Sequence, residues 1–277
     1  MIETSAFVGG GNMSRAIVLG MLAKGADASR IRISEPMAER RRMLAAEMPG
    51  VRIEADNVTA ASGADTLVLA VKPQLMEPVC AGLATLVQAE KPLVVSIAAG
   101  TRVADIDAWL GGGVAIVRAM PNQPALLGLG VSGLFANALA EGSGLERAEH
   151  ILASAGRTVR VNSEADIDAV TAVSGSGPAY FFLLIDMLTH AGETFGLERS
   201  TAATLALETA RGAAAVAADG EEDMATLIAR VRSPGGTTAA ALDSLENDQV
   251  RAIFERALTA ARDRATELAG GPLQGSA

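Results

Sequence analysis

Short apolar runs alternate with helical patterns over the first 160 residues of the chain. The runs "SAFVG", "IRIS", "TLVLAV", "LVVSI" and "VAIVRAM" have the length of strands, are rich in Val and Ile, and do not alternate apolar with polar positions. Strands of a parallel sheet that is buried on both faces show this pattern. Helical patterns such as residues 12–24 and 37–48 lie between the runs. The alternation predicts a parallel sheet with right-handed crossovers.

The pattern changes after about Val161, beyond which the chain is helix-periodic, rich in Ala and without a convincing strand. We therefore predict an α/β Rossmann-type parallel-sheet domain that binds a dinucleotide over residues 1–161. An all-α domain for substrate binding and dimerisation is expected over residues 162–277. The long stretch 198–220 would form a helix that is rich in Ala over much of its circumference. We expect the apolar face that the domain itself does not cover to contact a second subunit. The alternative is that Ala serves helix propensity alone.

The composition excludes several classes of function. The net charge is −9, the longest basic run is Arg40-Arg41-Arg42, and aromatic residues make up 3%, which disfavours binding to nucleic acid or to anionic membranes. Cys80 is the single cysteine, so disulfides within the chain and cysteine-rich metal sites are excluded, and no metal is expected. No apolar stretch approaches the ~20 residues of a membrane span. A soluble cytoplasmic protein is expected.

A glycine-rich turn follows the first predicted strand and precedes the first predicted helix. In "FVGGGNMSRAI", Gly9, Gly11 and Ser14 form a G-x-G-x-x-S pattern. The first glycine permits a tight turn, the second lets the backbone approach a pyrophosphate, and the phosphate lies at the helix N-terminus. The strand–turn–helix context indicates a dinucleotide site rather than an ordinary turn.

The end of the second strand, "IRISEPMAERRR", bears on the choice between the two nicotinamide cofactors. Glu35 lies where an acidic side chain holds the ribose hydroxyls of NADH, and its charge would repel a 2′-phosphate. Arg40, Arg41 and Arg42 follow within two helical turns and are able to pair with that phosphate, or else form a solvated helix face. The preference between NADH and NADPH stays open, with Glu35 favouring NADH.

Further loops at strand ends are expected beside the cofactor, among them "AVKPQ", "SIAAG" and "RAMPNQPA". The residues expected to bind the cofactor are Gly9, Gly10, Gly11, Asn12, Met13, Ser34, Glu35, Asn57, Ala70, Val71, Lys72, Pro73, Ala98 and Ala99.

The scarcity of proton donors narrows the chemistry. Reduction of a ketone needs an acid at the oxygen, normally His, Lys or Tyr. The helical region has no lysine, its one tyrosine is Tyr180, and His190 lies in an apolar helical segment that favours a structural role. An iminium already carries its positive charge, so hydride reaches its carbon without a strong acid, and a neutral hydroxyl partner for the nitrogen suffices. The sequence thus favours reduction of a C=N bond.

A second glycine turn, "SPGGTT", precedes a helix near the end of the chain. Backbone N–H groups at such a helix start would face an anion such as a substrate carboxylate. Thr237 and Thr238 supply hydroxyl groups at the same place. One turn is therefore expected to hold the cofactor pyrophosphate, and the other a small acid.

Six motifs along the chain resemble those of the pyrroline-5-carboxylate reductases: "GGGNMS", "AVKPQ", "SIAAG", "RAMPNQPA", "GSGPAY" and "VRSPGGTTAAAL". The resemblance implies reduction of 1-pyrroline-5-carboxylate to L-proline with NADPH or NADH, and a homodimer that assembles further into a decamer in many members. It also implies that Thr238 is the catalytic residue at the ring nitrogen. The implied substrate-binding residues are Glu164, Glu221, Ser233, Gly236, Thr237 and Thr238, the two acids being alternatively solvated or helix-capping carboxylates.

Two departures from the family pattern and three rival functions stay open. Members commonly carry a Lys-Asp pair before the "SPGG" turn where this chain has Ile228-Ala229-Arg230, and many have small or polar residues in place of Glu35. A β-hydroxyacid dehydrogenase would place a lysine on the long helix over residues 181–195, which has none. A reductase of another cyclic imine shares the same chemistry. A non-catalytic dinucleotide sensor would not need the second turn.

Overall fold

The computed structural model describes residues 3–220 and 222–270. The chain forms two compact units, one made of Met1–Ser176 with Ala261–Ala277 and the other of Gly177–Ala260. The predicted boundary near residue 161 coincides with the end of the sheet, whereas the first unit extends through two further helical segments and includes the end of the last helix.

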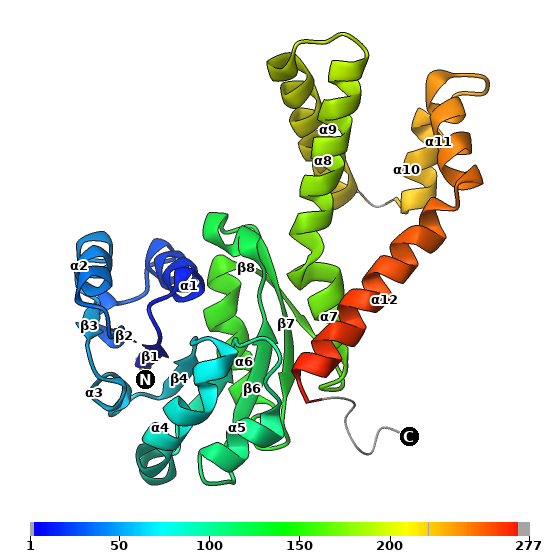
Figure 1. The fold of residues 1–277 in the computed structure, drawn as a ribbon. Helices are drawn as coiled ribbons and strands as arrows, with labels where there is room; N and C mark the ends of the chain where they lie inside the picture. The colour runs from blue at the N-terminus through cyan, green and yellow to red at the C-terminus, as the bar shows by residue number, and fades with distance from the viewer. Residues whose placement is uncertain (1–2, 221, 271–277) are drawn as a thin grey trace. The chain divides into compact units, whose positions relative to one another are not determined.

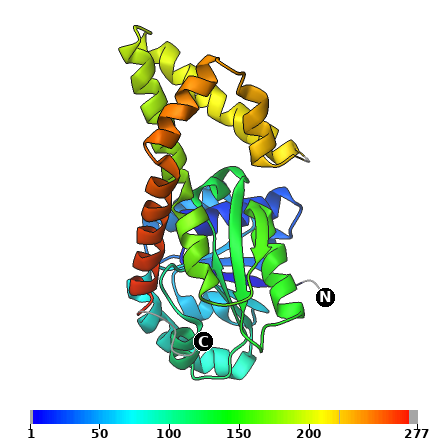
Figure 2. The ribbon, with the colours of Figure 1, turned by 90° about the vertical axis from the view of Figure 1, so that its right-hand side faces the viewer.

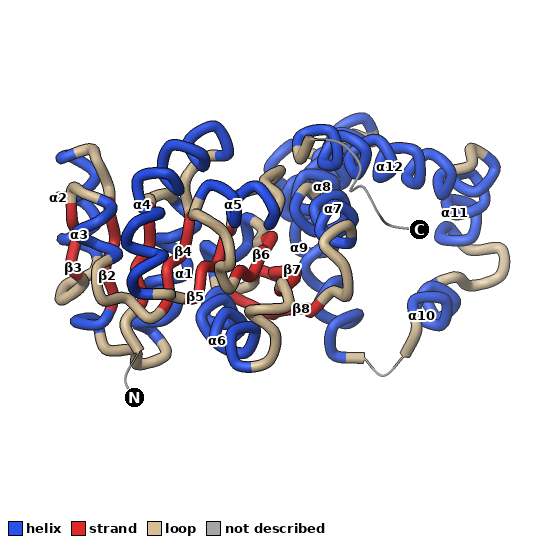
Figure 3. Tube along the Cα trace, turned by 90° about the horizontal axis from the view of Figure 1, so that it is seen from below, coloured by secondary structure: helices blue, strands red, loops and turns tan. Residues whose placement is uncertain are grey.

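The first unit is built on an eight-stranded sheet of order β3-β2-β1-β4-β5-β6-β7-β8 (Figures 1 and 3). All neighbouring pairs from β3 to β6 are parallel, as predicted. The strands are β1 Ser5–Val8, β2 Ile31–Ser34, β3 Arg52–Glu54, β4 Thr66–Leu69, β5 Leu93–Ser96, β6 Ile116–Met120, β7 Gly130–Ala136 and β8 Gly156–Arg160.

The sheet departs from the parallel prediction at β7, which runs antiparallel to β6 and parallel to β8. The connection from β6 to β7, residues 121–129, is shorter than the dozen or so residues that a parallel crossover needs. A short connection of this kind brings the chain back in the opposite direction beside the strand it has left.

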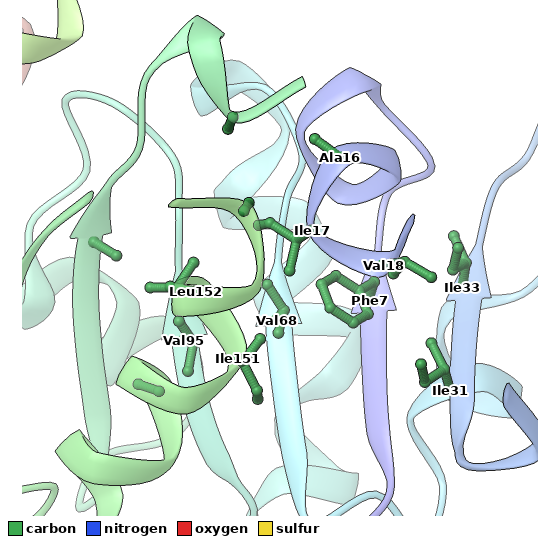
Figure 4. Packing of buried hydrophobic residues seen from close by; sticks show 14 of the residues in the cluster. Phe7, Ala16, Ile17, Val18, Ile31, Ile33, Val68, Val95, Ile151 and Leu152 are labelled. Atoms are coloured by element: carbon green, nitrogen blue, oxygen red, sulfur yellow. The ribbon is translucent and has the colours of Figure 1, made fainter. Parts of the chain in front are cut away.

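Helices cover both faces of the sheet, which explains the continuous apolar runs of the strands. Alternate strand residues point to opposite faces. Phe7 and Val68 pack with α1 and α6 on one face (Figure 4), and Val8 and Leu69 pack with α4 and α5 on the other. The helices of this unit are α1 Asn12–Ala23, α2 Ala38–Glu47, α3 Asn57–Ala61, α4 Met76–Glu90, α5 Val103–Trp109, α6 Ser143–Leu152 and α7 Asp166–Val170.

The second unit is helical throughout its described residues. Its longest helices, α8 and α9, are joined by a short loop and pack against each other (Figures 1 and 2). The helices are α8 Gly177–Thr194, α9 Arg199–Asp219, α10 Met224–Val231, α11 Thr237–Asn247 and the first part of α12 Val250–Leu268.

Much of the apolar surface of α8 lies exposed within a single chain. Phe181, Phe182 and Leu183 are each more than half exposed, and Phe195, just beyond the helix, is 83% exposed. The helical run Asp166–Thr194 is also long and apolar enough to span a membrane by length and composition, with only 11% of its most apolar stretch buried. The expectation that no segment reaches that length is therefore wrong for this run.

Candidate active site

The parallel strands bring the predicted cofactor loops to one edge of the sheet. The segments that follow β1, β2, β4 and β5 all leave from the carboxyl ends of their strands. The strand order reverses between β1 and β4, and in open α/β sheets the ligand crevice lies at such a switch point. Topology alone thus places a ligand crevice beside Gly9.

The glycine turn after β1 has the geometry that a dinucleotide needs. Gly9 has φ +107°, and a Cβ there would lie 2.8 Å from the carbonyl oxygen of Ala70, so a larger residue does not fit. Gly11 is the N-cap of α1, no side chain caps that helix, and a Cβ on Gly11 would meet no atom within 4 Å. An anion can therefore approach the backbone N–H groups at the start of α1.

Ser14 occupies the place of the third glycine and strengthens the turn. Its hydroxyl is fully buried and donates a 2.6 Å hydrogen bond to the carbonyl oxygen of Gly9. This bond fastens the turn to the first turn of α1, so the substitution is compatible with the fold. Asn12 and Met13 lie between the two, with Asn12 exposed.

The predicted residues at the end of β2 are linked to each other. The buried hydroxyl of Ser34 lies 2.7 Å from Oδ1 of Asn57, the first residue of α3. The carboxylate of Glu35 is also buried: Oε1 accepts a hydrogen bond from the N–H of Met37, and Oε2 lies 3.8 Å from Nε of Arg40. Glu35 thus faces both the start of α2 and an arginine.

The remaining predicted cofactor residues lie at the ends of β4 and β5. Ala70 and Val71 are partly buried, whereas Lys72 and Pro73 are exposed. Ala98 is buried and Ala99 is partly exposed in the loop after β5. All the predicted cofactor residues thus belong to the first unit. They lie at the carboxyl ends of β1, β2, β4 and β5 or in the segments that directly follow these strands, or, for Asn57, at the start of α3.

Asn122, in the loop after β6, joins two of the motifs found in the sequence. Its side-chain amide donates to the carbonyl oxygen of Ser174, and its Oδ1 accepts from the N–H of Val131. Ser174 lies in a π-helical turn, Thr171–Gly175, and a Cβ on Gly175 would lie 2.7 Å from the Met120 methyl carbon. The "AMPN" and "SGSG" segments are therefore packed together, and a side chain at Gly175 would require the Met120 methyl group to move.

A buried cluster of charged residues begins in β6, just before this loop, and was not predicted from the sequence as a cluster. Arg118 of β6 pairs with Glu164 at 2.9 Å, and Arg102 pairs with Asp168 of α7 at 2.8 Å. The Thr266 hydroxyl of α12 also donates to Asp168. The only sequence signal was an arginine inside an otherwise apolar strand run, "VAIVRAM".

Glu164, predicted to bind substrate, is a member of this cluster. Its Oε1 accepts from Arg118 and from the backbone N–H of Val103, the first residue of α5. The carboxylate thus caps a helix and neutralises an arginine. Its role towards substrate stays a prediction.

The second glycine turn lies in the Gly177–Ala260 unit. Gly235 has φ +70°, Gly236 is the N-cap of α11, and the N–H of Gly236 donates to the carbonyl oxygen of Ser233. No side chain caps α11, so the N–H groups of its first turn are available to an anion beside the Thr237 and Thr238 hydroxyls.

An ion pair between Arg232 and Asp243 of α11 braces the entry to this turn. Arg230 pairs instead with Glu222. Both ion pairs involve arginines of the segment that directly precedes the turn. Glu221, also predicted to bind substrate, lies outside the described residues.

The described residues contain no group of three His, Cys, Asp or Glu side chains placed to hold a metal ion. His190, for which the sequence favoured a structural role, is exposed on α8. The described residues therefore suggest no metal ligand set and no histidine to add to the two glycine turns.

Comparison with known proteins identifies the family. Residues 164–268 match the model described as pyrroline-5-carboxylate reductase dimerisation, and residues 4–100 match the model described as NADP oxidoreductase, coenzyme F420-dependent. The exposed apolar surface of α8 therefore belongs to a dimerisation region.

Individual relatives agree over nearly the whole chain. Pyrroline-5-carboxylate reductase of Pseudomonas aeruginosa is 48% identical, with 95% of this chain and 96% of that protein covered. The structure of the Coxiella burnetii reductase superposes with a TM-score of 0.93 at 40% identity, covering 99% and 100% of the two chains. That of Plasmodium falciparum pyrroline carboxylate reductase, with NADP bound, has a TM-score of 0.83 at 26% identity, covering 96% and 98%. The chain belongs to the pyrroline-5-carboxylate reductase family.

Proposed function

We propose that this protein reduces 1-pyrroline-5-carboxylate to L-proline with NADPH or NADH, in the last step of proline synthesis. The observation that carries the proposal is the pair of glycine turns, Gly9–Gly11 and Ser233–Gly236. Each opens a helix whose N-terminus has no side-chain cap. Two anion-binding helix starts match a reaction between a pyrophosphate-containing cofactor and a small acid.

The residues at the first turn fit a nicotinamide dinucleotide. Gly9 leaves no room for a side chain, and Gly11 leaves open space in front of the backbone. When bound there, the reduced cofactor supplies the hydride. The Gly9 to Met13 segment and the loops after β2, β4 and β5 would hold it.

The second turn would hold and orient the imine. Its N–H groups bind the carboxylate, with Ser233, Gly236 and Thr237 shaping that site, and the Thr238 hydroxyl bonds the ring nitrogen. Because the nitrogen of the protonated imine already carries the charge, hydride addition to carbon neutralises it and no strong acid is needed. Thr238 is partly buried and Thr237 exposed in the first turn of α11.

The proposal includes self-association and location. The exposed apolar residues of α8 lie in the region that matches the dimerisation model, which supports a homodimer. Assembly of five such dimers and a cytoplasmic location complete the proposal.

Replacement of Thr238 tests the site. We expect Thr238→Ala to lower kcat with 1-pyrroline-5-carboxylate by roughly ten- to a thousandfold, the effect of losing one positioned polar group, while NADPH binding is retained. Thr238→Ser keeps the hydroxyl and serves as the matched control. Unchanged turnover in Thr238→Ala would remove this residue from the reaction.

A further inference from the structure

The side chain of Arg40 distinguishes it from the two arginines that follow. Its Nη2 donates a 3.2 Å hydrogen bond to the carbonyl oxygen of Gly10 in the cofactor loop. Arg41 instead donates to the carbonyl oxygens of Glu35 and Pro36, and Arg42 is exposed on α2. Of the three, Arg40 is thus the one whose guanidinium is fixed at the glycine turn.

Arg40 also neutralises the acidic residue that would repel a phosphate. Its Nε lies 3.8 Å from Oε2 of Glu35, whose side chain is 7% exposed. Oε1 of Glu35 is occupied by the N–H of Met37. The carboxylate therefore faces the ribose position with its charge balanced by an arginine and by the start of α2.

An open groove borders the Arg40 side chain. It has a volume of about 550 Å³ and is lined by residues of the turn and of α1 and α2: Gly10, Asn12, Arg15, Arg40, Met43, Leu44, Ala46 and Glu47. That volume is within the range of small-molecule sites. Arg15 is already paired with Glu47 at the edge of the groove. The Arg40 side chain is 42% exposed, so its remaining N–H groups are accessible to a ligand.

We propose that Arg40 is the residue that binds the adenosine 2′-phosphate when NADPH is the cofactor. The residue at the end of β2 marks the ribose 2′ position in this fold, and a nearby arginine accommodates a phosphate there. Arg40 touches that residue, is anchored to the pyrophosphate turn, and borders open space. A planar guanidinium suits a phosphate through paired hydrogen bonds. The inference rests on the proposed cofactor site.

Binding of 2′,5′-ADP and of 5′-AMP, measured by calorimetry on the full chain, tests the proposal without turnover. Arg40→Gln should weaken 2′,5′-ADP binding by about tenfold or more, as expected for hydrogen bonds to a charged group, and change 5′-AMP binding by less than about threefold. Arg42→Gln is the matched control and should change neither. Arg40→Lys keeps the charge and should weaken 2′,5′-ADP binding by less than Arg40→Gln does.

Two outcomes would overturn the proposal. If Arg40→Gln binds 2′,5′-ADP as the natural chain does, another group reads the phosphate. If it loses both nucleotides equally, Arg40 only supports the glycine turn. A natural chain that binds neither nucleotide would contradict the cofactor site itself, and so the proposed function. The ratio of kcat/KM for NADPH to that for NADH should fall about tenfold in Arg40→Gln, as a second readout.

Discussion

Asp168 offers a sharp test of how the first unit holds its helical segments to the sheet. Its carboxylate accepts from Arg102 at 2.8 Å and from Thr266 at 3.0 Å, and lies 3.6 Å from Arg118. These partners come from the start of α5, from α12 and from β6. Asp168→Asn preserves the shape of the side chain but leaves two buried arginines with the single countercharge of Glu164.

The expected loss follows from burial. The side chains of Asp168 and Arg102 are each 5% exposed, and that of Arg118 is 2% exposed, so water cannot replace the missing charge. Removing one partner from a buried ion pair costs about 3–5 kcal/mol. For a chain of this size, the midpoint of thermal unfolding should fall by roughly 6–20 °C.

Urea and thermal unfolding of the natural chain and Asp168→Asn, at one protein concentration because self-association contributes to stability, measure the difference. Asp105→Asn is the matched control, because Asp105 is exposed in the first turn of α5. The control should lose less than about 1 kcal/mol. If both variants lose the same small amount, the cluster does not stabilise the fold as argued.

Four further predictions concern the cofactor, the cysteine and the dimer. Glu35→Ser should raise the ratio of kcat/KM for NADPH over NADH by about tenfold, and an unmoved ratio would mean that the arginines or the backbone set the preference. Burial raises the pKa of Cys80 from its ordinary 9.0 to about 11, so the folded chain should resist Ellman's reagent at pH 8, with rapid labelling contradicting the buried site. Because the folded chain keeps the Cys80 thiol protonated to a higher pH, this residue's contribution to the free energy of unfolding is fully present below pH 9 and is lost as the pH rises towards 11. Urea unfolding midpoints measured over this pH range would show the loss. Phe182→Glu should dissociate the dimer in sedimentation experiments, whereas Leu139→Glu, an equally exposed apolar site in the first unit, should not.

The sequence predicted those parts of the fold that depend on local pattern. Continuous apolar strands and the glycine turn at Gly9 give a parallel sheet and its cofactor edge, because burial on both faces and positive φ each leave a direct mark on residue type. The reversal at β7 left no such mark. It depends on a short connection that contains a helical turn of its own, Gln123–Leu127. The strand that follows, β7, contains two glycines and so lacks the continuous apolar run of the other strands.

Both glycine turns were recognisable from the sequence, because their residue types depend on the local backbone, and the residues assigned to the cofactor and the substrate stay predictions. Contacts between side chains far apart in the sequence were missed. No sequence pattern near Arg118 indicates that its partners, Glu164 and Asp168, lie some fifty residues further along the chain. Arg40 and Glu35 were both singled out in the sequence. The contacts of Arg40 with Glu35 and with the carbonyl oxygen of Gly10 depend on how α2 packs beside the glycine turn, which the sequence does not show. Such pairings are properties of the folded chain.

Parallel oxidation of NADPH and NADH with 1-pyrroline-5-carboxylate, with proline quantified as the product, tests the central claim most directly. The account predicts rapid consumption of both cofactors and one proline formed per cofactor oxidised. Tight cofactor binding without consumption of either, at any concentration of the imine, would contradict it and would mean that the turn at Ser233–Gly236 holds a different small acid.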